Sequence, residues 1–311
     1  MERRYRARVL TVLHPCFVAA IVGFNPSAVR GQELEPRAYS PNPVGINFVL
    51  GGISRSSGDV LFNPSLPLEN VSARVKAGVI GYGRTFDWFG RLASAAIITP
   101  YVVGTASGDV AESRRSVERS GLADMRVRAA VNLLGGEALA PSEFARRKPQ
   151  TAVGVSLVVI APTGEYDSTK LVNIGSNRWA FKPEIGISQP LERWFLEAYA
   201  GVWFFTENDR FYGGVRREQR PVTTVQGHVS YTFAPQLWLA GDITYYRGGE
   251  TSLNGVANAD LQENLRMGVT LSVPLTRSHS LKISWSDGAK TRIGGDFTTY
   301  ALAWQYAWFD E

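Results

Sequence analysis

The stretch Leu265-Arg266-Met267-Gly268-Val269-Thr270-Leu271-Ser272-Val273 has an apolar side chain at every second position. Successive side chains of a β-strand point to opposite faces, so this stretch presents one apolar face and one mixed face. Segments of about ten residues with this pattern recur from Val44 to Phe309 and are typical of a transmembrane β-barrel. We expect about twelve strands, at residues 44–54, 70–83, 91–104, 122–134, 151–162, 178–189, 193–206, 221–233, 237–248, 262–273, 279–287 and 297–309.

The connections between these segments alternate between short and long. If the chain begins in the periplasm, the periplasmic turns are residues 84–90, 135–150, 190–192, 234–236 and 274–278, and the external loops are residues 55–69, 105–121, 163–177, 207–220, 249–261 and 288–296. Short periplasmic turns, long external loops and an even strand count are typical of bacterial outer-membrane barrels. No run of about 18 apolar residues predicts a membrane-spanning helix. The predicted fold class is therefore all-β, a closed antiparallel barrel.

The N-terminus has the composition of a secretory signal peptide. Arginines up to Arg8 precede the apolar residues 9–24, and Gly31 suits cleavage. We expect residues 1–31 to be a signal peptide, residues 32–43 a periplasmic N-terminal segment and residues 44–309 the outer-membrane barrel.

Composition excludes several classes of function once residues 1–31 are set aside. Of 33 Lys and Arg and 28 Asp and Glu, five Arg and one Glu lie in those residues, which leaves 28 basic against 27 acidic residues. A nearly neutral chain gives no support to nucleic-acid binding. Cys16, the only cysteine, lies in the signal peptide, so we expect no disulfide and no thiolate chemistry. Only His228 and His279 remain as histidines, and we expect neither a metal site nor a cofactor.

Aromatic side chains gather near the strand ends, where amphipathic rings favour the membrane–water interface. The last segment, Tyr300–Phe309, resembles the C-terminal signal that the barrel assembly machinery reads during insertion. Asp310-Glu311 departs from that signal, which ends on an aromatic residue. The expected partners are the barrel assembly machinery and outer-membrane lipid, lipopolysaccharide included.

Residues 135–150 are long for a periplasmic turn. Ser142-Glu143-Phe144-Ala145-Arg146-Arg147 predicts one short periplasmic helix, with a capping serine at its start and basic residues at its end. A surface helix at the barrel mouth is the simpler interpretation, and a plug or a helix that docks a partner is the alternative.

Several stretches carry a resemblance to a known family: Ala38-Tyr39-Ser40-Pro41-Asn42-Pro43-Val44-Gly45-Ile46-Asn47-Phe48, Ala161-Pro162-Thr163-Gly164-Glu165-Tyr166-Asp167, Leu171-Val172-Asn173-Ile174-Gly175-Ser176-Asn177-Arg178-Trp179 and Phe181-Lys182-Pro183-Glu184-Ile185-Gly186. Residues 35–309 resemble the meta-pathway phenol-degradation family of proteobacterial outer-membrane proteins. The resemblance implies a barrel encoded beside genes for aromatic degradation, with a role in transport of small solutes. It implies no catalytic residues.

The strand pattern assigns a set of polar side chains to the barrel interior, because a charge facing the middle of the bilayer costs about 2–4 kcal/mol. The set is Arg74, Lys76, Arg126, Arg128, Lys182, Glu184, Glu197, Gln226, His228, Asp242, Arg266 and Lys282. The simpler interpretation is a network of paired charges that fills the lumen. The alternative is a basic lining that favours anionic or hydrophobic solutes, such as aromatic carboxylates. About twelve strands lie between the filled and the open barrel sizes, so a narrow or gated pore is expected.

Two other classes of function remain as alternatives. A structural or surface-interaction barrel would have a closed lumen, and its loop arginines would meet lipopolysaccharide phosphates; these are Arg114, Arg115, Arg119, Arg210, Arg216, Arg217 and Arg220. A lipid hydrolase is suggested by His228 and Ser230, which share the spacing used by outer-membrane phospholipase A. The flanking residues Gln226–Tyr231 lack that family's Ser-Asn-Gly run, and the pair falls on the inward face. We therefore do not expect an enzyme.

Overall fold

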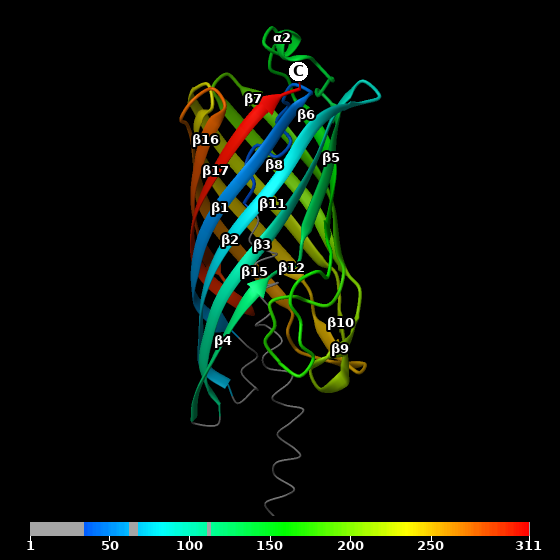
Figure 1. The fold of residues 1–311 in the computed structure, drawn as a ribbon, viewed down its shortest axis with the longest axis vertical. Coiled ribbons are helices and arrows are strands. Elements are labelled where there is room, and N and C mark those ends of the chain that lie inside the picture. The colour runs from blue at the N-terminus through cyan, green and yellow to red at the C-terminus, as the bar shows by residue number, and fades with distance from the viewer. Residues whose placement is uncertain (1–33, 62–67, 111–112, 311) are drawn as a thin grey trace, which may run out of the picture.

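The computed structural model describes residues 34–61, 68–110 and 113–310, and the predicted signal peptide lies outside them. One antiparallel sheet closes into a barrel with twelve strand positions around its circumference, as predicted (Figure 1). Around the barrel the strands are β1 (Ile46–Leu61), β2 (Leu68–Trp88), β3 (Arg91–Val110), β4 (Ser113–Leu122) with β5 (Arg126–Leu134), β6 (Ala152–Ile160), β7 (Ala180–Leu191), β8 (Trp194–Phe205), β11 (Val222–Ala234), β12 (Leu237–Gly248), β15 (Gln262–Pro274), β16 (His279–Lys290) and β17 (Gly294–Phe309). β4 and β5 together occupy one strand position, because both pair with β3. β1 pairs with β17 and so closes the barrel.

The strand bounds agree closely with the sequence pattern except in the first strands, where β2 also continues to Trp88 through most of the predicted turn 84–90. β12 has the predicted bounds, whereas β1 runs on to Leu61 and the β3–β4 hairpin occupies most of the predicted loop 105–121. Its ladder is unbroken from Tyr101 opposite Leu122 to Val110 opposite Ser113. Both faces of a strand can be polar beyond the hydrocarbon, so polarity there does not distinguish a strand from a loop.

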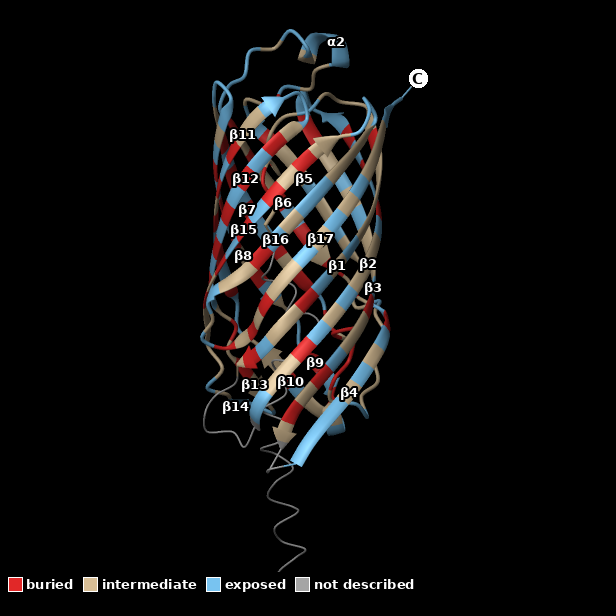
Figure 2. Cartoon of the chain, turned by 90° about the vertical axis from the view of Figure 1, so that its left-hand side faces the viewer, coloured by how far each residue is buried: buried red, intermediate tan, exposed pale blue. Residues whose placement is uncertain are grey.

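Buried and exposed residues alternate along most strands (Figure 2). The large apolar side chains of these strands are on the outside. Ile53 of β1 and Ile80 of β2 are 66% and 70% exposed, while His228 and Arg266 are buried. A soluble barrel would show the reverse arrangement, because its apolar face would form the core. The outer face therefore suits a lipid environment.

The two ends of the barrel differ. The C-terminus and helix α2 (Pro141–Phe144) lie at the end that we call periplasmic (Figure 1). α2 is the short helix expected within 135–150, but its N-cap is Ala140 and not Ser142, and the basic residues Arg146 and Arg147 lie beyond its end. Glu143 accepts a hydrogen bond from the Ala140 N–H at 3.0 Å. The external end carries a small sheet of β9 (Asn208–Phe211), β10 (Val215–Gln219), β13 (Thr251–Leu253) and β14 (Val256–Ala257), with a 3-10 turn η3 (Tyr212–Gly214). Among the helices that the structure describes, none is long and apolar enough to cross a membrane.

The N-terminal segment corrects one sequence prediction. Residues 32–43 were expected in the periplasm, but Leu34–Ser40 lies inside the barrel, where it is hydrogen-bonded to inward-facing residues of β7, β8 and β11. The segment has no periodic pattern that would show this position. Its main-chain and side-chain polar groups find partners on the polar inner face, which compensates them for the loss of water.

Candidate functional site: the barrel lumen

Most of the polar residues assigned to the interior do lie on the inner face. They come from β5, β7, β8, β11, β12, β15 and β16 and comprise Arg126, Arg128, Lys182, Glu184, Glu197, Gln226, His228, Asp242, Arg266 and Lys282. Cross-strand pairing explains why they meet, because residues directly opposite one another share a face. Glu197 faces His228, which in turn faces Asp242.

The prediction that Arg74 and Lys76 face the lumen is wrong. Both lie on the outer face of β2 together with Ile80, and the β2–β1 register is unbroken between them. The inner face of this part of β2 carries apolar side chains such as Ala73, which packs against Phe297. Both charges lie toward the external end of the strand, beyond Ile80, where an outward charge need not enter the hydrocarbon.

Arg37 anchors the N-terminal segment to the barrel wall. Its main-chain N–H donates to Glu197 Oε2 at 2.7 Å, and its side chain donates to Ser230 Oγ at 3.1 Å and to Thr232 Oγ1 at 2.7 Å. The guanidinium carbon also lies 4.3 Å from the ring centre of Phe195, a favourable cation–π distance. Ser230 is therefore engaged by the segment.

Tyr39 packs against the inner face of β6, β7 and β8 and is only 1% exposed. Its hydroxyl lies 2.8 Å from Ser156 Oγ and donates to Glu184 Oε1 at 3.0 Å. A Cβ at Gly186 would lie 2.2 Å from the Tyr39 ring, so this close approach requires glycine. Tyr199 contacts the other side, with ring centres 4.9 Å apart in an edge-to-face arrangement. The segment narrows the lumen at this level.

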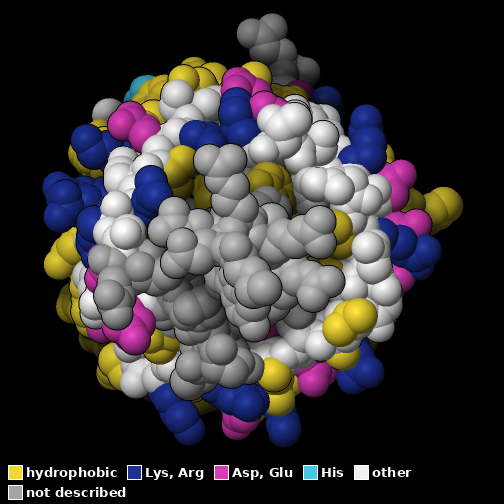
Figure 3. Space-filling model, turned by 90° about the horizontal axis from the view of Figure 1, so that it is seen from below, with side chains coloured by type: hydrophobic (Ala, Val, Ile, Leu, Met, Phe, Trp, Pro, Cys, Tyr) yellow, Lys and Arg dark blue, Asp and Glu magenta, His cyan; other side chains and the backbone are white. Residues whose placement is uncertain are grey.

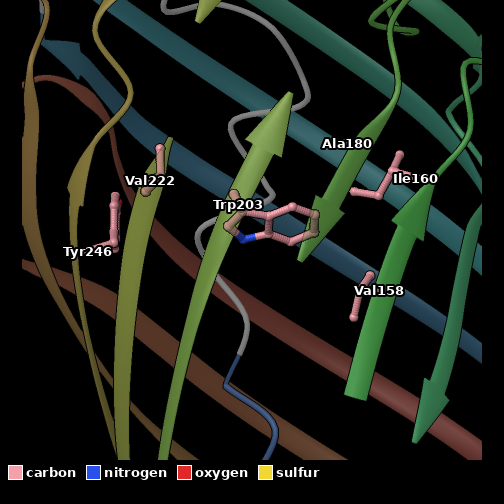
Figure 4. Packing of buried hydrophobic residues seen from close by; sticks show 6 residues of the cluster. All are labelled: Val158, Ile160, Ala180, Trp203, Val222 and Tyr246. Atoms are coloured by element: carbon pink, nitrogen blue, oxygen red, sulfur yellow. The ribbon is translucent and has the colours of Figure 1, made fainter. Parts of the chain in front are cut away.

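A buried ion pair lies beside Tyr39. Lys182 Nζ is 2.9 Å from Glu184 Oε2, which also accepts a hydrogen bond from Gln226 at 3.1 Å. Trp203 covers the ammonium at 5.4 Å. Toward the external end, Trp203 lies between Val222 and Tyr246 on one side and a second apolar group on the other, as Figure 4 shows; that group is Val158, Ile160 and Ala180.

His228 belongs to a separate polar cluster on the inner face. Its Nδ1 lies 2.7 Å from Asp242 Oδ1, and Thr270 donates to Asp242 Oδ2 at 2.9 Å. His228 and Ser230 are both buried inside the barrel, away from the apolar outer face. This placement gives a lipid no direct path to the pair, so the geometry does not support the phospholipase-like alternative.

The remaining basic residues of the lumen are mostly engaged. Arg126 pairs with Glu35 of the N-terminal segment at 3.3 Å, and the guanidinium of Arg128 lies 5.2 Å from the Tyr39 ring centre. Arg266 is fully buried and donates to Ser286 Oγ and to a main-chain carbonyl of β17. These cations stabilise the wall and the segment and are poorly placed to meet a solute.

A cavity of about 540 Å³ opens between the segment, the barrel wall and the α2 loop at the periplasmic end. Its lining includes four cationic side chains, Arg37, Arg147, Arg277 and Lys282, and three aromatic ones, Phe144, Phe195 and Trp238. None of the residues that line it is Asp or Glu. Lys282 Nζ lies 5.7 Å from the Trp238 ring centre. The cavity therefore offers positive charge beside flat apolar surface.

The α2 loop holds its place over the mouth through main-chain hydrogen bonds. Val44 donates to Leu139, Ala138 donates to Gly90, and Leu92 donates to Gly136. Residues 135–150 thus form one side of the cavity. This position is intermediate between the two interpretations of this segment, a helix on the surface of the mouth and a plug inside it. Sequence reasoning did not identify Arg37, Phe144 or Trp238 as site residues. The stretch from Ala38 to Phe48 had been noted only as part of the family resemblance.

At the external end, residues 161–179 fold over the wall beside the small sheet, and Phe211 is buried against Leu171 and Leu253. Figure 3 shows this end, with Lys and Arg side chains around the rim and Asp and Glu among them. Asp167 accepts hydrogen bonds from the hydroxyl and N–H of Thr169, and with Lys170 these lower its pKa to about 2. These interactions favour the ionised carboxylate of Asp167, so their contribution to folding stability is present above the ordinary pKa of Asp and is lost as the pH falls through about 2.

A closed antiparallel barrel with an apolar outer face and a polar interior is an outer-membrane β-barrel of channel architecture. The chain belongs to the family described as "Putative MetA-pathway of phenol degradation", whose model matches residues 56–302. The family resemblance inferred from the sequence is confirmed. No curated protein matches the chain.

Solved structures agree with this class. An outer-membrane channel from Pseudomonas putida F1 is similar with a TM-score of 0.76 at 20% identity, covering 89% of this chain and 100% of that chain. The translocator domain of the autotransporter NalP from Neisseria meningitidis has a TM-score of 0.56 at 9% identity, covering 94% and 99%. The β domain of the Bordetella autotransporter BrkA has a TM-score of 0.51 at 13% identity, covering 85% and 100%. At these identities the likeness concerns the fold alone.

Proposed function

We propose that the barrel passes small amphipathic anions, such as aromatic or other hydrophobic carboxylic acids, through the outer membrane. The periplasmic cavity carries this proposal, because it combines four cations with three aromatic rings and no carboxylate among its lining residues. Ligand sites are typically cavities of about 300–1,000 Å³ with apolar walls and a few polar groups. The cavity falls in that range.

The cavity chemistry suits a carboxylate joined to a ring. Among the residues that the structure describes, Lys282 and Arg277 make no ion pair and no side-chain hydrogen bond, although the charge of Glu35 acts on Lys282. Both side chains can donate to a carboxylate. Trp238 and Phe195 offer apolar surface beside them. Glu35 and Glu197, acidic residues of the nearby lumen, are already engaged with Arg126 and with Arg37.

The N-terminal segment narrows the lumen at Tyr39, and its position therefore sets the width of the solute path. We therefore propose a gated path in which the segment is displaced or loosened while the barrel wall stays fixed. The hydrogen bonds of Arg37 and Tyr39 hold the closed form.

A structural barrel with a closed lumen is the second candidate. The same hydrogen bonds favour it, since they tie the segment to β6, β7, β8 and β11 at several points. In that case the cavity would be a blind pocket, and the external end would be the working surface.

The test is single-channel recording of the folded protein in a planar bilayer with a salt gradient. We expect a small anion-preferring conductance that benzoate, added on the periplasmic side, blocks more strongly than neutral benzamide. Lys282→Gln should weaken the benzoate block about tenfold, since a charge-assisted hydrogen bond contributes about 1.5–3 kcal/mol. Lys290→Gln, at the external end of the same strand, is the matched control and should leave the block unchanged.

Silence from barrels shown to be folded would contradict the channel proposal and favour the structural candidate. Equal block by benzoate and benzamide would contradict the anion preference.

For partners, we propose the barrel assembly machinery during insertion, supported by the alternating aromatic residues of β17, and the lipids around the barrel.

A further inference from the structure

Three cationic side chains cluster on the outer face near the external end of β1 and β2. Arg55 lies directly opposite Lys76, and Arg74 lies directly opposite Ser57. Directly opposite residues on one face have Cβ atoms about 4.5–5.5 Å apart, and residues two apart on one strand share that face. Arg55, Arg74 and Lys76 therefore form one compact group, which we call the outer basic cluster.

The outer basic cluster lies at the level of the external membrane interface. Arg55 is directly opposite Tyr300 of β17, which is 61% exposed. On β3, Val103 pairs with Lys76, and the exposed Tyr101 lies two positions from Val103. Exposed aromatic residues mark the headgroup level of a membrane barrel. On the membrane side of the cluster lie Ile53 and Ile80, whose side chains face the hydrocarbon.

The cluster lacks a counter-charge within the part of the chain that the structure describes. Arg55, Arg74 and Lys76 make no ion pair and no side-chain hydrogen bond there. Like charges directly opposite one another destabilise a sheet. Two acidic residues of the same outer face lie near Arg74: Asp59 is its diagonal neighbour on β1, opposite Ser72, and Glu118 lies in its row on β4, across Thr105. Neither makes an ion pair with the cluster among the residues that the structure describes.

The arginines of the external loops differ from this group. Arg114 pairs with Asp109 at 3.3 Å, and Arg216 pairs with Glu207 at 2.8 Å. Arg220 lies 3.5 Å from Glu250. These loop arginines have acidic partners within the protein, whereas no ion pair joins the outer basic cluster to an acidic residue of the described chain.

We propose that the outer basic cluster binds the phosphate groups of the anionic glycolipid of the outer leaflet, lipopolysaccharide. Arg55 and Arg74 can each contact phosphate oxygens in two places, and Lys76 adds a point charge between them. The exposed Ile53 and Ile80 provide a surface for the acyl chains of the same molecule. An anchored glycolipid thus fits better than free phosphate, which would use the charges alone. This interaction is independent of solute passage.

The test is lipid binding by the full-length folded barrel in detergent, measured by native mass spectrometry. The probes are the Kdo2 form of lipid A, the same lipid with its phosphates removed, and inorganic phosphate. Arg74→Gln/Lys76→Gln should weaken binding of the phosphorylated lipid by about thirtyfold, as expected for two interfacial charges. Arg84→Gln, on the same face of β2 at the periplasmic end, is the matched control and should keep full binding.

Loss of binding on removal of the phosphates would support the proposal. Equal affinity of the double variant and the unmodified protein would overturn it, and so would equal binding of the dephosphorylated lipid. Displacement of the lipid by inorganic phosphate at equal concentration would overturn the lipid source and indicate a free-phosphate site. The exposed position of both residues allows the variants to fold, and heat-modifiable migration on a gel verifies this.

Discussion

At the scale of single residues, the Lys182–Glu184 pair is the clearest stabilising contact of the lumen. Both side chains are buried, and their charged atoms lie 2.9 Å apart. Removing one partner of a buried pair typically costs about 3–5 kcal/mol, because the other charge stays buried without compensation. Lys182→Met should therefore lower the free energy of unfolding by about 3 kcal/mol, measured by urea titration in lipid vesicles. The double variant Lys182→Met/Glu184→Gln should recover most of this loss, and a single variant of unchanged stability would show that the pair has no net role.

Arg37 makes the second residue-scale prediction. Arg37→Ala removes two side-chain hydrogen bonds to β11, each contributing about 1 kcal/mol. The N-terminal segment should then leave the wall more often, and its main-chain amides should exchange hydrogen at least tenfold faster, as followed by mass spectrometry on the peptide that contains residues 34–43. Arg146→Ala, on the exposed end of the α2 loop, should leave this exchange unchanged. Unaltered exchange in Arg37→Ala would mean that the remaining contacts of the segment, among them Glu35 with Arg126 and the hydroxyls of Tyr39 and Ser40, suffice to hold it.

Single residues also show how much of the barrel interior can be predicted from the sequence. Period-two alternation placed His228, Asp242 and Arg266 on the inner face, because one face of their strands must meet lipid along its whole length. The same rule failed for Arg74 and Lys76. It treats every charge as inward, although a strand that extends past the hydrocarbon can carry charges outward. The role of the inward set in solute passage remains a prediction.

At the scale of elements, residues 161–179 reinforce the wall where β4 gives way to β5. Asp124, in the break between them, accepts hydrogen bonds from the Gly164 N–H and from the N–H and hydroxyl of Ser176. Asp124→Ala should free this loop, and trypsin should then cleave after Lys170 at least tenfold faster while the barrel stays folded. Asp87→Ala, at the periplasmic end, serves as the control. Resistance of Asp124→Ala to trypsin would show that the remaining main-chain bonds suffice.

Strands and connecting segments differ in how well their positions follow from sequence. The alternation of apolar and polar residues predicts a strand directly, and the bounds of β12 and β15 were predicted to within one residue at each end. The N-terminal segment has no periodicity, and its contacts with Glu197 and Ser230 join residues more than 150 positions apart. Such contacts depend on the closed barrel and are not encoded in any local pattern, which is why the segment was expected in the periplasm.

At the scale of the whole molecule, the N-terminal segment lies inside the lumen along the inner face of β6, β7, β8 and β11, and a cavity lies at its periplasmic end. The segment narrows the lumen at Tyr39, and under the proposed function its position sets the width of the solute path. The segment itself lines part of the cavity through Pro36, Arg37 and Ser40, whereas Arg277 and Lys282 belong to the barrel wall. Changes at these two wall residues can alter binding in the cavity without removing the hydrogen bonds that hold the segment.

A cross-link tests whether movement of the segment opens the barrel. The hydroxyl oxygens of Ser40 and Ser188 lie 3.2 Å apart, within reach of a disulfide after modest adjustment. Cys16 lies in the predicted signal peptide, so Ser40→Cys/Ser188→Cys would be the only thiols of the exported chain. The oxidised variant should be silent in a planar bilayer, and a reductant should restore its conductance, because the bond pins the segment to β7. The single variant Ser40→Cys should conduct under both conditions. Conductance that persists in the oxidised double variant would mean that ions pass beside a fixed segment, and the gate would then have to lie elsewhere in the barrel.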